Sequence, residues 1–299
     1  MTTLAPSTPA PVLIPRPRSA VLEFCRQQPL GAVSFVIIVA MMFGGVFSNL
    51  VAPYDPLYID FDANLARPSV AHWFGTDAYG RDILSRIIFG SRTALVIGFT
   101  SSFLGSVIGA VLGIASAYFG GKIDAWIQRV MDVLLAFPII VLALVVVASL
   151  KAEVVFGIDV NLIVAIAIPV IPRVSRVVRA AALTIRVMPY IDAARAAGYS
   201  NSRIIFRHMA PNVVAPFLIM FTAFIAQAIL LEASLSFLGL GVTEPTPAWG
   251  LMLSGNAADF YREAPWMILF PGAAISLAVF AFNLFGDALR DYLDPRFKT

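Results

Sequence analysis

The sequence predicts an all-α integral membrane protein with six transmembrane helices. Of its 299 residues, 59% are hydrophobic and only 13% are charged, and the mean hydropathy of +0.85 excludes an ordinary soluble domain. Six apolar runs are long enough to cross the hydrocarbon core of a bilayer, which takes about 20 residues of helix. The basic residues gather in alternate connections between these runs. Together these observations indicate a polytopic helical bundle.

The chain begins with a polar tail, a first apolar run and a polar connection. Residues 1–29 hold five prolines before residue 18, and we expect a disordered cytoplasmic tail. The first span is expected at 32–51. It lacks an obvious small-x-small cleavage site, so we interpret it as a retained helix and not as a signal peptide. In the connection that follows, Asp77 to Arg92 alternates charges with apolar pairs, which predicts an amphipathic helix on the membrane surface.

The five remaining apolar runs are expected to span at 94–119, 127–150, 161–178, 213–238 and 266–285. The first of them carries Gly105, Gly109 and Gly113 on one helix face, a double G-x-x-x-G pattern that lets two helix backbones approach closely. Prolines at 138, 169 and 172 mark candidate hinges in the next two. The predicted organisation is a tail (1–29), a first helix with its extracytoplasmic connection (30–92) and a five-helix core (93–299).

The distribution of arginine and lysine predicts the orientation. With a cytoplasmic N-terminus, fifteen of these residues fall on the cytoplasmic side and six on the outside. Cytoplasmic connections of membrane proteins carry the excess of positive charge. Both termini are therefore expected in the cytoplasm, together with the polar segment from Pro189 to Pro211. The net charge of +3 follows this topology and indicates no patch for binding nucleic acid.

The segment 189–211 predicts two short helices with a break. Good helix formers fill 190–197, Gly198 is a C-cap able to take positive φ, and Ser200 or Asn201 can cap a second helix that ends at Pro211. Its expected apolar side consists of Ala193, Ala194, Ala197, Ile204, Ile205 and Met209. From the residues alone, two interpretations stay open. The segment is either a loop lying on its own bundle or a projection that fits a socket on a partner protein.

Few residues suit catalysis, metal binding or nucleotide hydrolysis. The single cysteine, Cys25, allows no intrachain disulfide, and two histidines cannot build a Cys/His metal cluster. None of the three lysines stands in a G-x-x-x-x-G-K frame, and H-E-x-x-H and G-x-S-x-G are absent from the sequence. We therefore expect neither an enzyme nor a cofactor bound by this chain.

Asp132 and Glu232 are the carboxylates best placed within the expected spans, and a carboxylate in a membrane is a functional candidate by default. Asp132 lies near the cytoplasmic end of its span, and Glu232 lies toward the outer end of its span beside Ser234 and Ser236. A structural role is favoured for both, with lining of a pathway as the alternative for Glu232. Two further alternatives, a membrane-embedded hydrolase and a standalone proton-coupled carrier, would depend on such carboxylates and are less favoured.

Several strings resemble a known family. Asp192-Ala193-Ala194, Gly198 four residues after Ala194, and Pro211 thirteen residues after Gly198 resemble the EAA loop of ABC-importer permeases. Asp192 replaces the usual Glu, and the run RHMAPN resembles the RHILPN version of peptide-transporter permeases, which accounts for the histidine at 208. Three more strings resemble the C-type permease subunit of dipeptide and oligopeptide importers: HWFGTDAYGRDILSRIIFGSR, LEASLSFLGLGVTEPTPAWG and FNLFGDALRDYLDPR.

This resemblance implies a six-helix permease subunit of a type I ABC importer, of MetI-like architecture, in the cytoplasmic (inner) membrane of a prokaryote. The implied partners are a second homologous permease, two P-loop ATPase subunits that bind ATP and Mg²⁺, and an extracytoplasmic solute-binding protein. The implied cargo is a di- or oligopeptide, with nickel or glutathione as alternatives. The residues implied to couple the chain to the ATPases are Asp192, Ala193, Ala194, Ala197, Gly198, Ile204, Ile205, His208 and Pro211.

Overall fold

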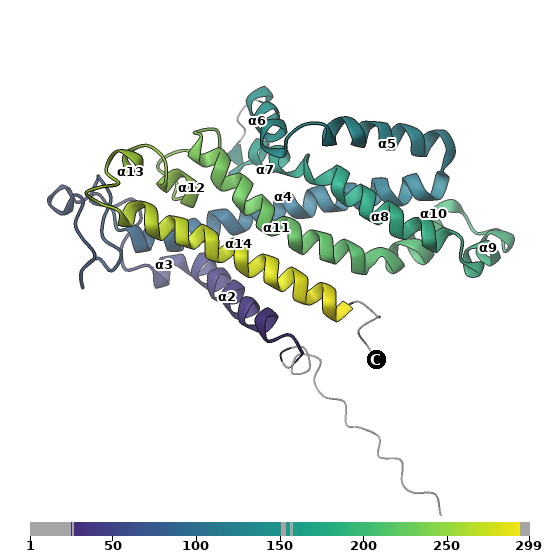
Figure 1. Ribbon diagram of the computed structural model, residues 1–299, viewed down its shortest axis with the longest axis horizontal. Helices are drawn as coiled ribbons and strands as arrows, with labels where there is room; N and C mark the ends of the chain where they lie inside the picture. The colour runs from purple at the N-terminus through teal and green to yellow at the C-terminus, as the bar shows by residue number, and fades with distance from the viewer. Residues whose placement is uncertain (1–24, 26, 151–153, 156–157, 294–299) are drawn as a thin grey trace, which may run out of the picture.

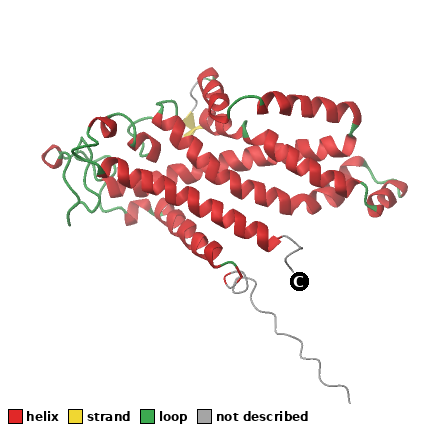
Figure 2. Ribbon diagram, viewed as in Figure 1, coloured by secondary structure: helices red, strands yellow, loops and turns green. Residues whose placement is uncertain are grey.

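The computed structural model describes residues 25, 27–150, 154–155 and 158–293. Most of the expected tail at 1–29 therefore lies outside the described residues. The described chain forms an elongated helical bundle, with long helices side by side and several short elements at its two ends (Figure 1). Within the described residues, two strands of two residues each, β1 (Val154–Val155) and β2 (Ile158–Asp159), pair antiparallel. Figure 2 shows this short sheet beside the helices.

Among the described residues, four helices are long and apolar enough to cross a membrane by themselves. They are α2 (Pro29–Val46), α4 (Ile83–Phe119), α11 (Val214–Phe237) and α14 (Trp266–Leu293). Two bent pairs pass the same test together, and if each pair is one span the total is six. This arrangement confirms the six-helix fold class predicted from the apolar runs.

The two bent pairs break where the sequence places prolines. Helix α5 (Gly121–Leu135) meets α6 (Ile139–Ser149) at an angle of 96°, and Pro138 is the N-cap residue of α6. Helix α7 (Val160–Ala167) meets α8 (Val170–Arg186) at 43°, with Pro169 as the N-cap residue of α8. Proline removes a backbone donor and clashes with the preceding turn, so it interrupts a helix. Two of the expected spans are therefore broken helices and not straight ones.

The helix expected at Asp77 to Arg92 is helical only from Ile83 and is not a separate element. Helix α4 begins at Ile83 and runs without interruption to Phe119, so the expected boundary between 92 and 93 falls inside a helix. Asp82 fixes this start, because its Oδ2 accepts hydrogen bonds from the backbone N–H of Ser85 at 2.8 Å and from the Ser85 hydroxyl at 2.7 Å. Residues 75–82 form a turn closed by a bridge between Thr76 and Asp82.

Helix α4 packs most closely against α8. A Cβ atom on Gly105, Gly109 or Gly113 would lie 2.6–2.7 Å from a backbone carbonyl oxygen of the α7–α8 pair, closer than real Cβ contacts allow. Only glycine therefore permits this distance between the helices. On its other sides α4 contacts α2, α11 and the start of α5, so it forms the centre of the bundle.

Several short elements lie at the two opposite ends of the bundle. One end holds the loop 52–82 with the 3₁₀ turn η1 (Phe61–Ala63), together with α3 (Ser48–Val51), α12 (Trp249–Met252) and α13 (Asn256–Asp259). The other end holds α9 (Pro189–Ala196) and α10 (Asn201–Ile204), which lie within the segment 189–211 (Figure 1). The outer face of α2 between the ends remains apolar, with Val33 and Val36 largely exposed, as lipid contact requires.

Candidate functional site

The segment 189–211 has the two-part form that its residues predict. Helix α9 ends at Ala196, and Gly198 follows with φ of +74°, a conformation that side-chain-bearing residues rarely adopt. Helix α10 then starts with Ser200 as its N-cap, whose hydroxyl accepts from the backbone N–H of Arg203 at 3.4 Å. The turn between the helices is closed by the Tyr199 N–H, which donates to the Ala194 carbonyl at 3.1 Å.

Pro211 does not end the second helix, contrary to the sequence prediction. The chain continues through a π-helical turn, η2 (Ile205–Met209), and a 3₁₀ turn, η3 (Ala210–Val213), directly into α11. The π-helical turn is wider than an α-helical turn and the 3₁₀ turn is tighter, and together they accommodate the proline ring without ending the helical path. The Asn212 side-chain amide donates to the His208 carbonyl at 2.7 Å, which satisfies an acceptor near the proline. The segment is therefore joined to α11 by a continuous helical path.

One face of the segment packs on the chain's own bundle. Ile191, Ala194, Ile204 and Met209 are at most 6% exposed and join a hydrophobic cluster with the ends of α4 and α8. Ala194 and Ile204, which the resemblance implies as contacts for a partner, are thus committed to the internal core. Any effect of these two on a partner is indirect, through the orientation of α9 and α10.

The opposite face of the segment remains free. Asp192, Ala193, Ala197, Gly198 and Pro211 are exposed, while Ile205 and His208 are half-buried. The two interpretations of the segment are therefore compatible, because one face rests on the bundle and the other is open to a partner. The apolar side expected from the sequence divides between these two faces.

Aromatic side chains around His208 form part of the free surface, and the sequence analysis did not select them. Tyr190, Tyr199 and Phe206 are 43%, 37% and 73% exposed. The Tyr199 ring lies 6.0 Å from the His208 ring in a stacked arrangement, and the guanidinium of Arg203 lies 4.1 Å from the centroid of Tyr199. Exposed aromatic side chains in a polar segment are a signal of a contact surface.

Polar contacts connect the segment to the bundle. The Tyr118 hydroxyl near the end of α4 donates to Asn201 Oδ1 at 2.7 Å, and the Arg186 guanidinium at the end of α8 donates to the Ala117 carbonyl at 2.9 Å. The guanidinium of Arg179 in α8 donates to both carboxylate oxygens of Asp124 in α5, at 2.7 and 2.5 Å. Bidentate charge-assisted contacts fix geometry strongly. The Tyr118–Asn201 hydrogen bond therefore joins the segment to α4, and the two arginines join α8 to α4 and to α5.

The two carboxylates within the expected spans have different surroundings. Asp132 is half-exposed and pairs with Arg176 of α8, which is the structural role favoured from the sequence. Glu232 is fully buried in α11; its Oε1 accepts from the Ser236 hydroxyl at 2.7 Å, and its Oε2 has no hydrogen-bond partner among the described residues. Within the same part of the chain, no group of three His, Cys, Asp or Glu side chains could hold a metal ion.

Comparison with known proteins identifies relatives of this chain. A family model described as "Binding-protein-dependent transport system inner membrane component" matches residues 105–299. The dipeptide transport system permease protein DppC of Alkalihalophilus pseudofirmus is 40% identical over 274 residues, which cover 92% of this chain and 88% of the relative. The glutathione transport system permease protein GsiD of Escherichia coli is 42% identical over 274 residues, covering 91% and 88%.

A solved structure shares the fold. An inward-facing form of the MetNI methionine ABC transporter aligns with a TM-score of 0.55 at 18% identity, covering 71% of this chain and 98% of that chain. At this identity the likeness concerns the fold alone. It agrees with the MetI-like architecture that the sequence strings imply.

Proposed function

The chain belongs to the family of binding-protein-dependent transport system inner membrane components, and from this premise we propose that it is the permease subunit of an ATP-driven importer of short peptides. The observation that carries the proposal is the 40% identity to a dipeptide permease over nine tenths of the chain. Glutathione is the second candidate cargo, because a glutathione permease is 42% identical over a similar length. Both candidates are small peptide-like molecules that carry carboxylates.

The family implies an ATPase and a solute-binding protein as partners. We extend this to a full assembly of two homologous permeases, two P-loop ATPases and one extracytoplasmic binding protein. The ATPases supply ATP hydrolysis, since this chain has no P-loop lysine. The free face of the segment 189–211 is the proposed docking surface for an ATPase. We call this segment the coupling segment from here on.

The proposed orientation follows from the charge distribution. The coupling segment lies at the cytoplasmic end, where an ATPase can reach it, and both termini lie on the same side. The loop 52–82 and helices α12 and α13 then lie at the extracytoplasmic end, facing the binding protein. The bundle between them crosses the inner membrane.

In the proposed mechanism, the coupling segment works as a lever. Closure of the ATPases displaces α9 and α10, and the hydrogen bond between Asn201 and Tyr118 passes the displacement to α4, which the Arg186–Ala117 contact joins to α8. The glycine face holds α4 and α8 together as one body. The breaks at Pro138 and Pro169 are the places where the remaining helices can change angle. A two-state movement of this kind needs rigid units joined at hinges.

Reconstitution tests this function directly. The complete assembly, purified through a tag on this chain, is placed in proteoliposomes with its binding protein outside and ATP inside. We expect uptake of radiolabelled dialanine that requires ATP and is lost when the catalytic base of the ATPases is removed. Uptake that proceeds without ATPases and collapses with the proton gradient would identify a proton-coupled carrier instead.

A further inference from the structure

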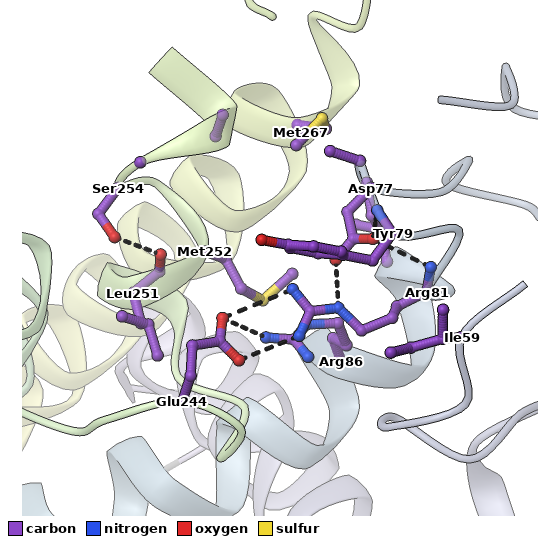
Figure 3. A pocket seen from close by; sticks show the side chains of 14 residues that line it. Ile59, Asp77, Tyr79, Arg81, Arg86, Glu244, Leu251, Met252, Ser254 and Met267 are labelled. Carbon is purple, nitrogen blue, oxygen red and sulfur yellow. Dashed lines mark hydrogen bonds and ion pairs between the residues drawn. The ribbon is translucent and has the colours of Figure 1, made fainter. Parts of the chain in front are cut away.

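A cavity at the end of the molecule opposite the coupling segment has a composition that the proposed function does not use. Its volume is about 390 Å³, and it opens between the loop that precedes α4 and the loop between α11 and α12. Sites for small molecules commonly measure about 300–1,000 Å³. Its lining includes the apolar side chains of Ile59, Leu251, Met252 and Met267 together with four charged side chains (Figure 3).

Two guanidinium groups converge on one carboxylate in this cavity. Arg81 Nη1 lies 3.0 Å from Glu244 Oε2, and Arg86 Nη2 lies 3.5 Å from Glu244 Oε1 (Figure 3). Arg81 also donates from Nε to Asp77 Oδ2 at 2.6 Å, and Arg86 donates to the Pro56 carbonyl at 3.2 Å. A guanidinium has five donors. Among the described residues, Arg86 makes two long hydrogen bonds, at 3.2 Å to the Pro56 carbonyl and at 3.5 Å to Glu244.

The two sides of this contact differ in how firmly they are held. The side chains of Arg86 and Arg81 are only 1% and 11% exposed, whereas Glu244 is 50% exposed on a loop. Burial lowers the pKa of the Arg81 guanidinium, but the carboxylates of Asp77 and Glu244 outweigh burial and hold this pKa above its ordinary value. Both guanidinium groups are therefore fixed by burial, arginine stays charged in proteins, and the half-exposed acceptor is the part that can move.

The loop that carries Glu244 does not depend on Glu244 for its position. The Thr93 hydroxyl donates to the Pro247 carbonyl at 2.9 Å, and the Trp249 indole donates to the Ile87 carbonyl at 2.9 Å. At the other end of the loop, the Val242 N–H donates to the Ser236 hydroxyl at 3.0 Å. These three hydrogen bonds hold the loop on both sides of Glu244 without using its carboxylate.

From these observations we propose that the cavity binds the C-terminal carboxylate of a short peptide, with Arg81 and Arg86 as its donors and Glu244 as an internal carboxylate that the ligand displaces. Paired guanidinium groups match the geometry of a carboxylate. The apolar side chains of the lining then receive the aliphatic parts of the peptide. After the ligand displaces it from the two arginines, the Glu244 carboxylate remains near the cavity as a negative charge. The inference rests on the proposed function for the choice of a peptide and locates a first contact on the permease itself.

The test measures binding of dialanine to the membrane complex that copurifies with the full-length chain, in nanodiscs and without the solute-binding protein. Calorimetry compares dialanine, dialanine amide, which lacks the carboxylate, and acetate, which lacks the peptide. We expect dialanine to bind saturably and its amide to bind about tenfold more weakly, because charge-assisted hydrogen bonds are lost. Acetate binding as tightly as dialanine would show an anion site and overturn the peptide as ligand.

Glu244→Gln is the decisive variant, because it removes the competing charge and so predicts a gain. We expect dialanine to bind on the order of tenfold more tightly to this variant than to the wild type. Glu263→Gln, an exposed glutamate at the same end, is the matched control and should leave affinity unchanged. Unchanged or weaker binding by Glu244→Gln, with or without a lower melting temperature, would mean that Glu244 is a structural strut and the inference is wrong.

Transport separates this inference from the proposed function. If dialanine is imported with ATP but Glu244→Gln leaves binding unchanged, the cavity is not a ligand site and the importer assignment stands. If no variant imports dialanine while Glu244→Gln still tightens its binding, the cavity stands as a carboxylate site and the peptide-importer assignment fails.

Discussion

Gly109 of α4 is the position at which a substitution tests the close packing of α4 on α8 most directly. A Cβ atom there would lie 2.7 Å from the Ile171 carbonyl oxygen and 2.8 Å from the Val174 Cβ. Both are at or next to the backbone, so neither can turn aside, and α8 must move. Gly105 and Gly113 on the same face meet α7 and α8 equally closely, so the helix cannot pivot away at one point.

The size of the effect follows from these distances. Extra atoms in a packed interior cost about 1–3 kcal/mol, while alanine in place of glycine gains roughly 1 kcal/mol of helix propensity. Gly109→Ala should therefore destabilise only modestly. Gly109→Leu adds a branched side chain with no space to enter, and its cost should reach about 3 kcal/mol or more.

The assay is thermal unfolding of the detergent-solubilised complex, followed by tryptophan fluorescence. At about 2–4 °C per kcal/mol, Gly109→Leu should lower the melting temperature by roughly 6–12 °C or prevent assembly. Gly44→Leu in α2 is the matched control, because nothing lies within 4 Å of a Cβ built there. Equal melting temperatures for Gly109→Leu, Gly44→Leu and the wild type would refute the packing argument.

Four further predictions concern coupling and orientation. The Gly198→Asp chain should insert normally but lose transport, since a side chain at φ of +74° costs about 1 kcal/mol and changes the direction of α10. Asparagine tolerates this φ better, so Gly198→Asn should retain more activity in the uptake assay. Ala197→Leu should reduce copurification of the ATPases by steric exclusion at the free face, and full retention would place the docking surface elsewhere. Tyr118→Phe, which loses the hydrogen bond to Asn201, should keep ATPase binding but lower transport per ATP hydrolysed; unchanged coupling would show that this bond transmits nothing. Cys25 should resist an impermeant thiol reagent added outside intact cells, and efficient labelling would reverse the orientation.

Much of the fold could be predicted from local sequence. Apolar run length alone indicated six spans, and Gly198 and Ser200 marked the turn and cap of the coupling segment, because these depend on neighbouring residues. The start of α4 was missed, since Asp82 was one of several polar residues that could cap a helix. Proline usually ends a helix, so the sequence predicts a helix end at Pro211, but a π-helical turn before it lets the helical path continue.

What the sequence could not provide was the set of long-range contacts. The division of the coupling segment into a buried and a free face depends on where α4 and α8 end, so Ala193 and Ala194 could not be told apart by composition. The sequence signature around Arg81 and Arg86 was recognised, but no chemical role followed from it. Their shared partner, Glu244, lies some 160 positions away in the chain, and only the folded structure brings the three together.

Cross-linking from the free face of the coupling segment tests the central claim most directly. In a Cys25→Ser background, Ala193→Cys and Ala197→Cys are treated with a short bis-maleimide in membranes that contain the complete assembly with a reactive cysteine in the ATPase groove. The account predicts a product containing an ATPase from both positions and none from Val70→Cys, which is 94% exposed at the opposite end. Absence of an ATPase product from both positions while the ATPases still copurify, or a product from Val70→Cys, would contradict it.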